Sequence, residues 1–274
     1  MSFMLNQSTQ EKTMQHYVGK TALITGASSG IGESFAYELA ERKMNLVLTA
    51  RSEDKLQALA AQLRDLYSIS VEVIATDLSR EGEGFRIYDE VQARQLHIDM
   101  LVNNAGFSTH GAFESILPDQ DHRQAMLNVV AVVDLTHAFI PGMLAKGAGS
   151  IINIGSTTSF YPLPRQAVYA ATKAFVLSFS EALWIEYRKR GIKVLALCPG
   201  ATNTDFFDAM GRDVVAGKHS PQKVVLVGLS ALEHNRHYTI PGFKNSFESN
   251  ILPRLLPRAA MANLVESVSQ RAFN

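Results

Sequence analysis

A tyrosine and a lysine stand one helical turn apart in a stretch of small and apolar residues. In the segment "AVYAATKAF", Tyr169 precedes Lys173 by four positions, so a helix would place both side chains on one face. A phenol has a pKa of roughly 10, and a nearby ammonium lowers it by favouring the phenolate. The pair could therefore deliver a proton near neutral pH, although two exposed side chains at a chance spacing would look the same.

A glycine-rich segment near the N-terminus has the features of a phosphate-binding turn. In "ALITGASSGIGESFAYELA", Gly26, Gly30 and Gly32 follow an expected strand and open an expected helix. Glycines allow a tight turn close to a pyrophosphate, and the helix N-terminus offers unpaired N–H groups. Ser28 and Ser29 can donate further hydrogen bonds. The segment predicts a dinucleotide site, and the alternative is a glycine-rich turn that binds nothing.

The end of the second expected strand indicates which dinucleotide is bound. A carboxylate here would bind the ribose 2′-hydroxyl of NAD, whereas an arginine accommodates the 2′-phosphate of NADP. In "LVLTARSEDKL", Thr49 and Ala50 end the strand and Arg51 follows directly. A guanidinium carries a permanent charge and two parallel donors that match a phosphate. We therefore predict NADP (NADPH), and the alternative is that Arg51 is a surface residue near a helix start.

Short β-rich runs alternate with helical patterns along nearly the whole chain. The expected strands are apolar throughout and cover residues 21–25, 45–50, 71–76, 99–105, 150–156, 192–199 and 237–241. The expected helices include residues 32–42, 53–67, 119–146 and 164–190. Continuous apolar strands suit a parallel sheet covered on both faces. We predict an α/β fold with a doubly wound sheet of about seven strands. Residues 1–17 would be a flexible tail, 18–245 the catalytic domain and 246–274 a helical extension.

The composition narrows the class of protein. The chain has 274 residues with 26 Lys plus Arg and 26 Asp plus Glu, so no net charge favours a nucleic-acid partner. The single cysteine, Cys198, lies in the apolar run "VLALCP", which suits a core residue and a reducing, cytoplasmic setting. The polar start is not a secretory signal, and no apolar run reaches the ~18 residues of a membrane span. The histidines lack zinc-ligand spacing, so no metal site is expected.

Taken in order, these segments resemble the short-chain dehydrogenases/reductases over residues 18–245. In "TGASSGIG", Ile31 completes the cofactor loop, and "DL" after the third strand resembles the pair that contacts adenine, Asp77 and Leu78. The remaining matches are "NNAG", with Asn104, Ala105 and Gly106, and "CPGATNT" near the nicotinamide, with Pro199, Gly200, Thr202 and Thr204. The resemblance implies a single-domain Rossmann fold in which these residues contact the cofactor. Asn103 and Asn104 are also expected to brace the sheet and the cofactor loop.

The same resemblance assigns four catalytic residues: Asn128 in "MLNVV", Ser156 in "INIGS", Tyr169 and Lys173. Reducing a carbonyl needs a hydride from the cofactor and a proton for the developing alkoxide. Tyr169 would supply the proton, Lys173 would lower its pKa and hold the nicotinamide ribose, and Ser156 would hydrogen-bond the substrate oxygen. Asn128 would connect Lys173 to a water chain. Ser156 could instead be a strand-end cap, and Asn128 a structural amide.

The last quarter of the chain should shape the substrate pocket, because ligands bind beyond the carboxyl ends of such strands. The residues that suggest an apolar pocket, or simply core packing, are Phe160, Tyr161, Leu163, Phe206, Phe207 and Met210. His110 lies in a loop near the expected cleft. In the extension, Pro253 and Pro257 interrupt an amphipathic pattern flanked by arginines. This pattern fits best a packed helix, and otherwise a lid, an oligomer contact or a membrane-surface helix.

The leading hypothesis is an NADPH-dependent reductase of an apolar ketone or aldehyde. A 3-oxoacyl reductase acting on a CoA- or carrier-bound chain is a close alternative, and a dinucleotide sensor without catalysis is an alternative of another class. The set Ser156, Tyr169 and Lys173 argues against the sensor, since binding alone does not need it. An apolar face recurs every four residues on the long helix, at Phe175, Phe179, Leu183 and Tyr187. By resemblance, such helices pair in a homodimer or homotetramer.

Overall fold

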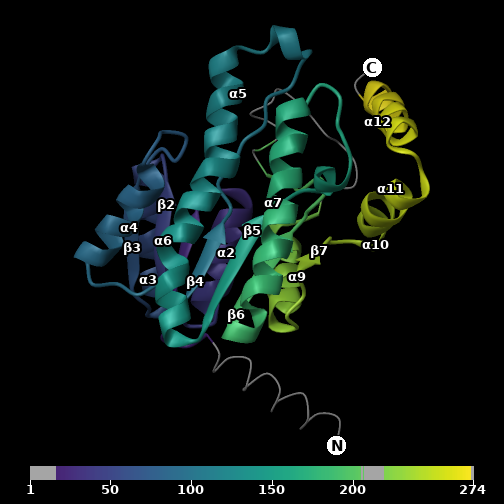
Figure 1. The fold of residues 1–274 in the computed structure, drawn as a ribbon. Helices are drawn as coiled ribbons and strands as arrows, with labels where there is room; N and C mark the ends of the chain where they lie inside the picture. The colour runs from purple at the N-terminus through teal and green to yellow at the C-terminus, as the bar shows by residue number, and fades with distance from the viewer. Residues whose placement is uncertain (1–16, 205, 207–218, 273–274) are drawn as a thin grey trace, which may run out of the picture.

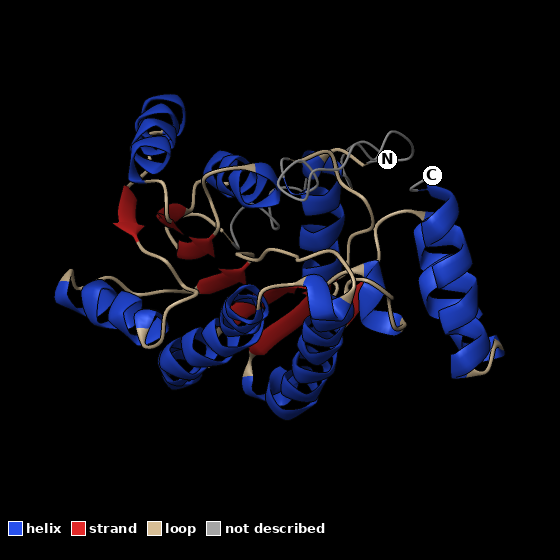
Figure 2. Cartoon of the chain, turned by 90° about the horizontal axis from the view of Figure 1, so that it is seen from above, coloured by secondary structure: helices blue, strands red, loops and turns tan. Residues whose placement is uncertain are grey.

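The fold is a parallel sheet between two layers of helices. The computed structural model describes residues 17–204, 206 and 219–272 (Figure 1). Seven parallel strands form one sheet in the order β3-β2-β1-β4-β5-β6-β7. Seen from above, the strands lie in the middle with helices on either side (Figure 2). This is the doubly wound Rossmann arrangement that the sequence predicts.

The strands are short and mostly buried. They are β1 (Thr21–Thr25), β2 (Asn45–Ala50), β3 (Val71–Ala75), β4 (Met100–Asn103), β5 (Gly149–Ile154), β6 (Ile192–Leu197) and β7 (Tyr238–Thr239). Every expected strand is present, but several end earlier than their apolar runs. At these carboxyl ends the chain leaves the sheet and enters loops. The strand order reverses between β1 and β4, which opens the crevice where such sheets bind ligands.

Each face of the sheet is covered by its own helices and its own core. One face carries α2 (Gly30–Glu41), α3 (Glu53–Tyr67) and α9 (Pro221–Glu233), and the other carries α4 (Glu83–Ala93), α6 (Ala131–Lys146) and α7 (Ala167–Tyr187). Neighbouring residues of one strand serve different cores, as Leu23 and Ile24 do, because side chains alternate across a strand. The expected helix 164–190 begins only at Ala167 and ends in the turn η4 (Arg188–Arg190) before Gly191.

The long helix expected over residues 119–146 is continuous but not regular. It consists of α5 (Pro118–Ala125), a π-helical turn η2 (Met126–Val130) and α6. The π turn contains Asn128, and such insertions often mark functional sites. By length and composition alone this helix of 29 residues, Pro118–Lys146, could cross a membrane, but 44% of its most apolar stretch is buried inside the fold. Its buried residues belong to the core beneath β4 and β5.

The expected domain boundaries shift by a few residues. Tyr17, placed in the flexible tail, is 1% exposed and donates a hydrogen bond of 2.8 Å to Glu233 Oε1. It therefore belongs to the domain, and residues 1–16 lie outside the described part. The extension comprises α10 (Phe243–Ser246), the π turn η5 (Phe247–Ile251), α11 (Leu252–Leu255) and α12 (Arg258–Ala272). Figure 1 shows it in yellow at the edge of the molecule, beyond α7 and β7.

Candidate active site

Tyr169 and Lys173 lie on the first turns of α7 and are both buried. Tyr169 is 9% exposed and Lys173 is 5% exposed, so the interpretation of an exposed chance pair is wrong. The Lys173 ammonium lies 5.8 Å from the centre of the Tyr169 ring and donates a hydrogen bond of 2.8 Å to the carbonyl of Ile154. The carboxyl end of β5 therefore fixes the lysine below the tyrosine.

Ser156 follows β5 directly and forms the cap that the sequence offered as one of two roles, while its contact with a substrate oxygen stays a prediction. Its hydroxyl caps the short helix η3 (Thr157–Phe160) by accepting a hydrogen bond of 3.1 Å from the Thr158 backbone N–H. The same hydroxyl is hydrogen-bonded to Tyr169. Ser159 is a separate element of this cap, since its side chain accepts from the Ser156 backbone N–H. The cap thus holds the Ser156 hydroxyl against the phenol.

The pKa values of the pair differ from the expectation in one respect. Burial raises the pKa of Tyr169 to about 12, against the opposing effect of the Ser156 hydrogen bond. The expected lowering by Lys173 is not among the effects on this phenol, and loss of hydration is the largest of them. Burial also lowers the pKa of Lys173 to about 8. At neutral pH the phenol therefore carries its proton and the lysine is still largely charged.

Asn128 is 1% exposed and its amide is satisfied by protein groups. Its Nδ2 donates to the carbonyl of Phe107 at 3.0 Å and to Thr172 Oγ1 at 3.2 Å, and its Oδ1 accepts from the Phe107 N–H at 3.2 Å. A side chain on Gly106 would meet both Asn128 Oδ1, at 3.0 Å, and Lys173 Nζ, at 3.5 Å. Asn128 is thus a structural amide that also lies beside the lysine, and its link to a water chain remains a prediction.

The glycine-rich turn fits a pyrophosphate. Gly26 and Gly30 have φ values of 65° and 62°, in the left-handed region that favours glycine. A side chain on Gly32 would collide with the Gly26 carbonyl and come within 2.5 Å of Asn104 Nδ2. Ser29 precedes α2 without making a side-chain cap, so the first N–H groups of this helix can bind an anion. The same half-buried turn carries Ser28 and Ile31.

The segment after β4 supports this turn from the other side of the crevice. Asn104 Nδ2 donates to the carbonyls of Thr25 and Gly26, at 2.8 and 3.2 Å. The Thr25 hydroxyl accepts from the backbone N–H groups of Asn104 and Ala105, both at 2.9 Å. Asn103 joins β4 to β5 through a 2.8 Å hydrogen bond to Asn153. These contacts brace the sheet and hold the cofactor loop.

The opposite end of the crevice collects charged side chains. Asp77 lies after β3, next to the buried Leu78, and Arg51 is exposed after β2. The pKa of Asp77 is lowered, against its partial burial, by hydrogen bonds from Ser79 and by the nearby cations Arg123 and Arg51. Arg123 Nη2 lies 3.0 Å from Asp77 Oδ2. The sequence pattern did not single out Arg123, because α5 brings it here from 46 residues away.

The loop after β6 lies against the glycine-rich turn. Thr202 is 4% exposed and its hydroxyl donates to the carbonyl of Gly200 at 3.0 Å. A side chain on Gly30 would come within 2.9 Å of the Thr204 methyl group. Pro199, which follows Cys198, accepts a hydrogen bond from the Thr157 backbone N–H. The residues expected to contact the nicotinamide are thus close to those expected to hold the phosphates.

The apolar residues expected near the substrate have different surroundings. The Phe206 ring lies 5.8 Å from the Tyr169 ring, at the reacting end. Phe160 instead packs on Tyr238 in a small core cluster, as the core-packing alternative expects. Tyr161 hydrogen-bonds Thr157 and Ser249. Leu163 and His110 are half-buried, and Phe207 and Met210 lie outside the described residues.

Two polar groups near the reacting end were missed from the sequence. Gln166 lies three residues before Tyr169 and donates a 2.7 Å hydrogen bond to Ser108 Oγ. The neighbouring Thr109 backbone donates to Gln124, whose side chain is fully buried. No local pattern marks Ser108 or Gln166, because only the fold brings the loop after β4 against the start of α7.

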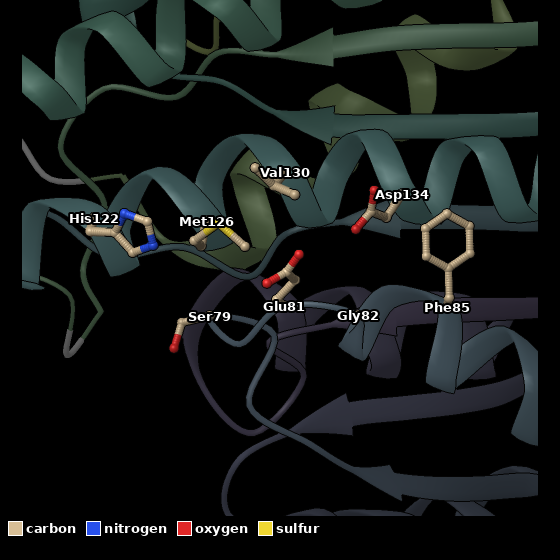
Figure 3. A pocket seen from close by; sticks show the side chains of 8 residues that line it. All are labelled: Ser79, Glu81, Gly82, Phe85, His122, Met126, Val130 and Asp134. Atoms are coloured by element: carbon tan, nitrogen blue, oxygen red, sulfur yellow. The ribbon is translucent and has the colours of Figure 1, made fainter.

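A hollow of about 550 Å³ lies elsewhere, between α4 and the long helix (Figure 3). Its lining residues are Ser79, Glu81, Gly82, Phe85, His122, Met126, Val130 and Asp134. Met126, Val130 and Asp134 share a face of the long helix that differs from the face of Asn128. None of the expected site residues lines it. In the described part of the chain, no group of three or more His, Cys, Asp or Glu side chains could hold a metal ion.

Comparisons with known proteins agree with this geometry. The family model described as short chain dehydrogenase matches residues 20–214. The very-long-chain 3-oxoacyl-CoA reductase of Bos taurus is 36% identical over 189 residues, which are 67% of this chain and 59% of that protein. The chain therefore spans less than two thirds of this relative's length.

Two solved structures are also similar. A short-chain dehydrogenase from Sphingobium yanoikuyae in complex with NADPH has 36% identity and a TM-score of 0.79, covering 86% of this chain and 93% of that one. The bulky-bulky ketone specific alcohol dehydrogenase from Comamonas testosteroni has 31% identity and a TM-score of 0.75, with 93% of both chains covered.

The Rossmann sheet, the glycine-rich turn and the buried tyrosine–lysine pair define a nicotinamide-dependent oxidoreductase that interconverts hydroxyl and carbonyl groups. The chain belongs to the short-chain dehydrogenase/reductase family.

Proposed function

We propose that this protein is an NADPH-dependent reductase of an apolar ketone or aldehyde, running reversibly. One observation carries the proposal. The Tyr169 hydroxyl is hydrogen-bonded to Ser156, carries its proton at neutral pH, and shares a buried site with the Lys173 ammonium and the Phe206 ring. This arrangement provides a proton donor, a second hydroxyl for the substrate oxygen and an apolar neighbour.

The roles of the side chains follow from these contacts. A bound NADPH supplies the hydride. Ser156 and Tyr169 hydrogen-bond the carbonyl oxygen and so stabilise the negative charge that develops on it. Tyr169 then transfers its proton to this oxygen. Lys173, whose ammonium is held below the phenol by the Ile154 carbonyl, stabilises the phenolate that remains. The hydrogen bonds from Asn104 to the carbonyls of Thr25 and Gly26 hold the phosphate turn in a fixed position relative to the reacting end.

The choice of NADPH rests on Arg51 and its surroundings. Arg51 is exposed at the end of β2, close enough to Asp77 to affect the pKa of that carboxyl. The solved relative from Sphingobium yanoikuyae contains NADPH. Charge-assisted hydrogen bonds contribute about 1.5–3 kcal/mol, so Arg51→Ala should weaken NADPH binding roughly ten- to hundredfold. NADH has no 2′-phosphate, and its affinity should hardly change.

Fluorescence titration of both cofactors tests this choice. Arg236→Ala, which removes another exposed arginine, is the matched control. The double variant Ala50→Asp with Arg51→Ala should favour NADH, because the carboxylate repels the phosphate and accepts the ribose hydroxyl. Equal losses for NADH and NADPH in Arg51→Ala would show that Arg51 supports the fold instead.

A second candidate substrate is a 3-oxoacyl-CoA. The observation that favours it is the similarity to very-long-chain 3-oxoacyl-CoA reductases, with which 67% of this chain aligns. The decisive experiment measures NADPH oxidation by the purified protein against bulky ketones, aldehydes and 3-oxoacyl-CoA esters of increasing chain length. Turnover of the ketones alone supports the first candidate, and turnover that increases with acyl length supports the second. A protein that binds NADPH but reduces none of them would be a sensor.

The assembly and the setting are also proposals. On α7, Phe175 is 37% exposed and stacks on Phe179 with ring centres 5.4 Å apart. Pairing of this face in a homodimer or homotetramer would cover it. Cys198 is a buried free thiol, which is compatible with a cytoplasmic setting. Sedimentation equilibrium tests the assembly, and fractionation of cells tests the location.

A further inference from the structure

The outer side of the extension carries a line of exposed apolar side chains. Phe243 is 88% exposed, Phe247 46%, Ile251 43% and Leu255 72%. We call these four residues the apolar stripe. Large side chains of this kind are seldom exposed together on a surface that binds nothing.

The backbone arranges the stripe along one side of a helical segment. α10, η5 and α11 follow one another without a break from Phe243 to Leu255. In a regular α-helix, residues four positions apart are offset by roughly 40° around the helix axis. The central part, Phe247–Ile251, is a wider π turn, which reduces this offset. The four side chains therefore share one side of the segment.

The other side of this segment is fixed against the reacting end. Ser249 is 2% exposed and hydrogen-bonds Tyr161, which follows the η3 helix capped by Ser156. Asn245 lies against Gly200, where an added side chain would come within 2.5 Å of its Nδ2. The apolar stripe is thus attached to the active site by its inner side. In Figure 1 the segment lies at the rim of the molecule, beyond β7 and α7.

The charged side chains around the apolar stripe favour an anionic partner. The chain as a whole is balanced, with 26 cationic and 26 anionic side chains. Residues 243–258 instead contain three cations, Lys244, Arg254 and Arg258, and one carboxylate, Glu248. Arg254 and Arg258 are exposed. The side chain of Lys244 is 86% exposed and its ammonium lies 3.9 Å from the exposed Glu248 carboxylate, so the segment keeps a net charge of about two cations. Aromatic and aliphatic side chains beside cations suit the boundary between acyl chains and anionic headgroups.

We propose that the apolar stripe docks this protein on the surface of an anionic lipid bilayer. Phe243, Phe247, Ile251 and Leu255 enter the acyl boundary, and Lys244, Arg254 and Arg258 bind the headgroups. Docking itself does not depend on the reaction. The consequence of docking does rest on the proposed function. Because the reacting end is attached to the inner side of the stripe, docking would keep it near a bilayer that contains its apolar substrate.

The test is sedimentation of the full chain with NADPH and vesicles of phosphatidylcholine, either alone or mixed with phosphatidylserine, which makes the surface anionic. Wild type should pellet with the anionic vesicles and much less with the neutral ones, and high salt should release it. Phe243→Ser with Leu255→Ser should weaken binding at least about tenfold. Leu66→Ser with Phe85→Ser, exposed residues of α3 and α4, is the matched control and should bind as wild type.

A second variant tests the charges without touching the apolar stripe. Each cation near an anionic surface contributes about fivefold, so Lys244→Gln with Arg254→Gln should weaken binding by about thirtyfold. Lys189→Gln with Lys223→Gln is its control, since both lysines are exposed elsewhere. All variants should keep wild-type NADPH affinity, which reports an intact fold.

Three outcomes would overturn the proposal. The first is that wild type does not bind anionic vesicles, and the second is that the stripe variant binds them as well as wild type does. The third is that wild type is a dimer whereas the stripe variant is a monomer. The last result would make the stripe a subunit interface. Vesicle binding is measured without substrate, so its failure is distinct from failure of the reductase assay.

Discussion

Replacing Lys173 by methionine should stabilise the cofactor-free protein. Lys173 is 5% exposed, and burial lowers the pKa of its ammonium from 10.5 to about 8. At 1.36 kcal/mol for each tenfold change in proton affinity, keeping this charge inside the fold costs roughly 3 kcal/mol at pH 7. Methionine removes the charge but leaves the Ile154 carbonyl without its donor, which costs about 1 kcal/mol. The net gain in unfolding free energy is about 2 kcal/mol at pH 7.

The pH dependence distinguishes this effect from a change in packing. Between pH 8 and 10.5, the unfolded lysine binds more protons than the folded one, so wild-type stability rises with pH in this window. The methionine variant lacks this rise. Its advantage should therefore be largest at pH 7 and disappear by about pH 10.5, where only the lost hydrogen bond remains.

Urea denaturation of the cofactor-free proteins at pH 7, 8.5 and 10 measures this difference. Lys189→Met, at an exposed lysine of η4, is the control and should show no such pH dependence. A Lys173→Met variant that is less stable than wild type at pH 7, or a difference that does not change with pH, would refute the reasoning. The same variant should bind NADPH more weakly, and unchanged affinity would reject the role of Lys173 at the ribose.

The remaining predictions concern the proton donor, the cofactor turn and a half-buried carboxylate. Tyr169→Phe should abolish turnover and leave NADPH binding nearly intact, and substantial residual activity would reject Tyr169 as the donor. Gly32→Ala should abolish NADPH binding and lower the melting temperature, because its methyl group collides with the Gly26 carbonyl, whereas Gly142→Ala, with 3.8 Å of room, should do neither. Partial burial, together with Glu81 and against the opposing effect of His137, raises the pKa of Asp134, so its ionisation opposes folding as pH rises through the carboxyl range. Asp134→Asn should therefore raise the melting temperature at pH 7, with a gain that shrinks on acidification; a gain independent of pH would contradict this.

The sequence was sufficient to predict the parts of the candidate site that lie within short segments of the chain. The turn from Gly26 to Gly32 and the spacing of Tyr169 and Lys173 are local, because each is contained within a loop or one helical turn. The strands were found because apolar runs mark buried parallel strands. Their carboxyl ends were overestimated, since residues that leave the sheet for the site stay buried too, as Cys198 does.

The electrostatics of the site could not be predicted from the same patterns. Proximity of Lys173 suggested a lowered pKa for Tyr169, but the amount of water excluded from the two groups decides the outcome. The π turn at Asn128 likewise escaped prediction, because a helical pattern of apolar residues does not report one additional residue in a turn.

The sequence by itself determined the order of strands and helices and the glycine-rich turn, and it predicted the catalytic residue types, because these depend on neighbours in the chain. Tertiary structure alone brought Arg123 to Asp77, Gln166 to Ser108 and Ser249 to Tyr161. It also decided that Lys173 is buried and that Phe243 is exposed. Contacts between distant segments and the exclusion of water depend on how the helices pack on the sheet, and no local spacing contains that information.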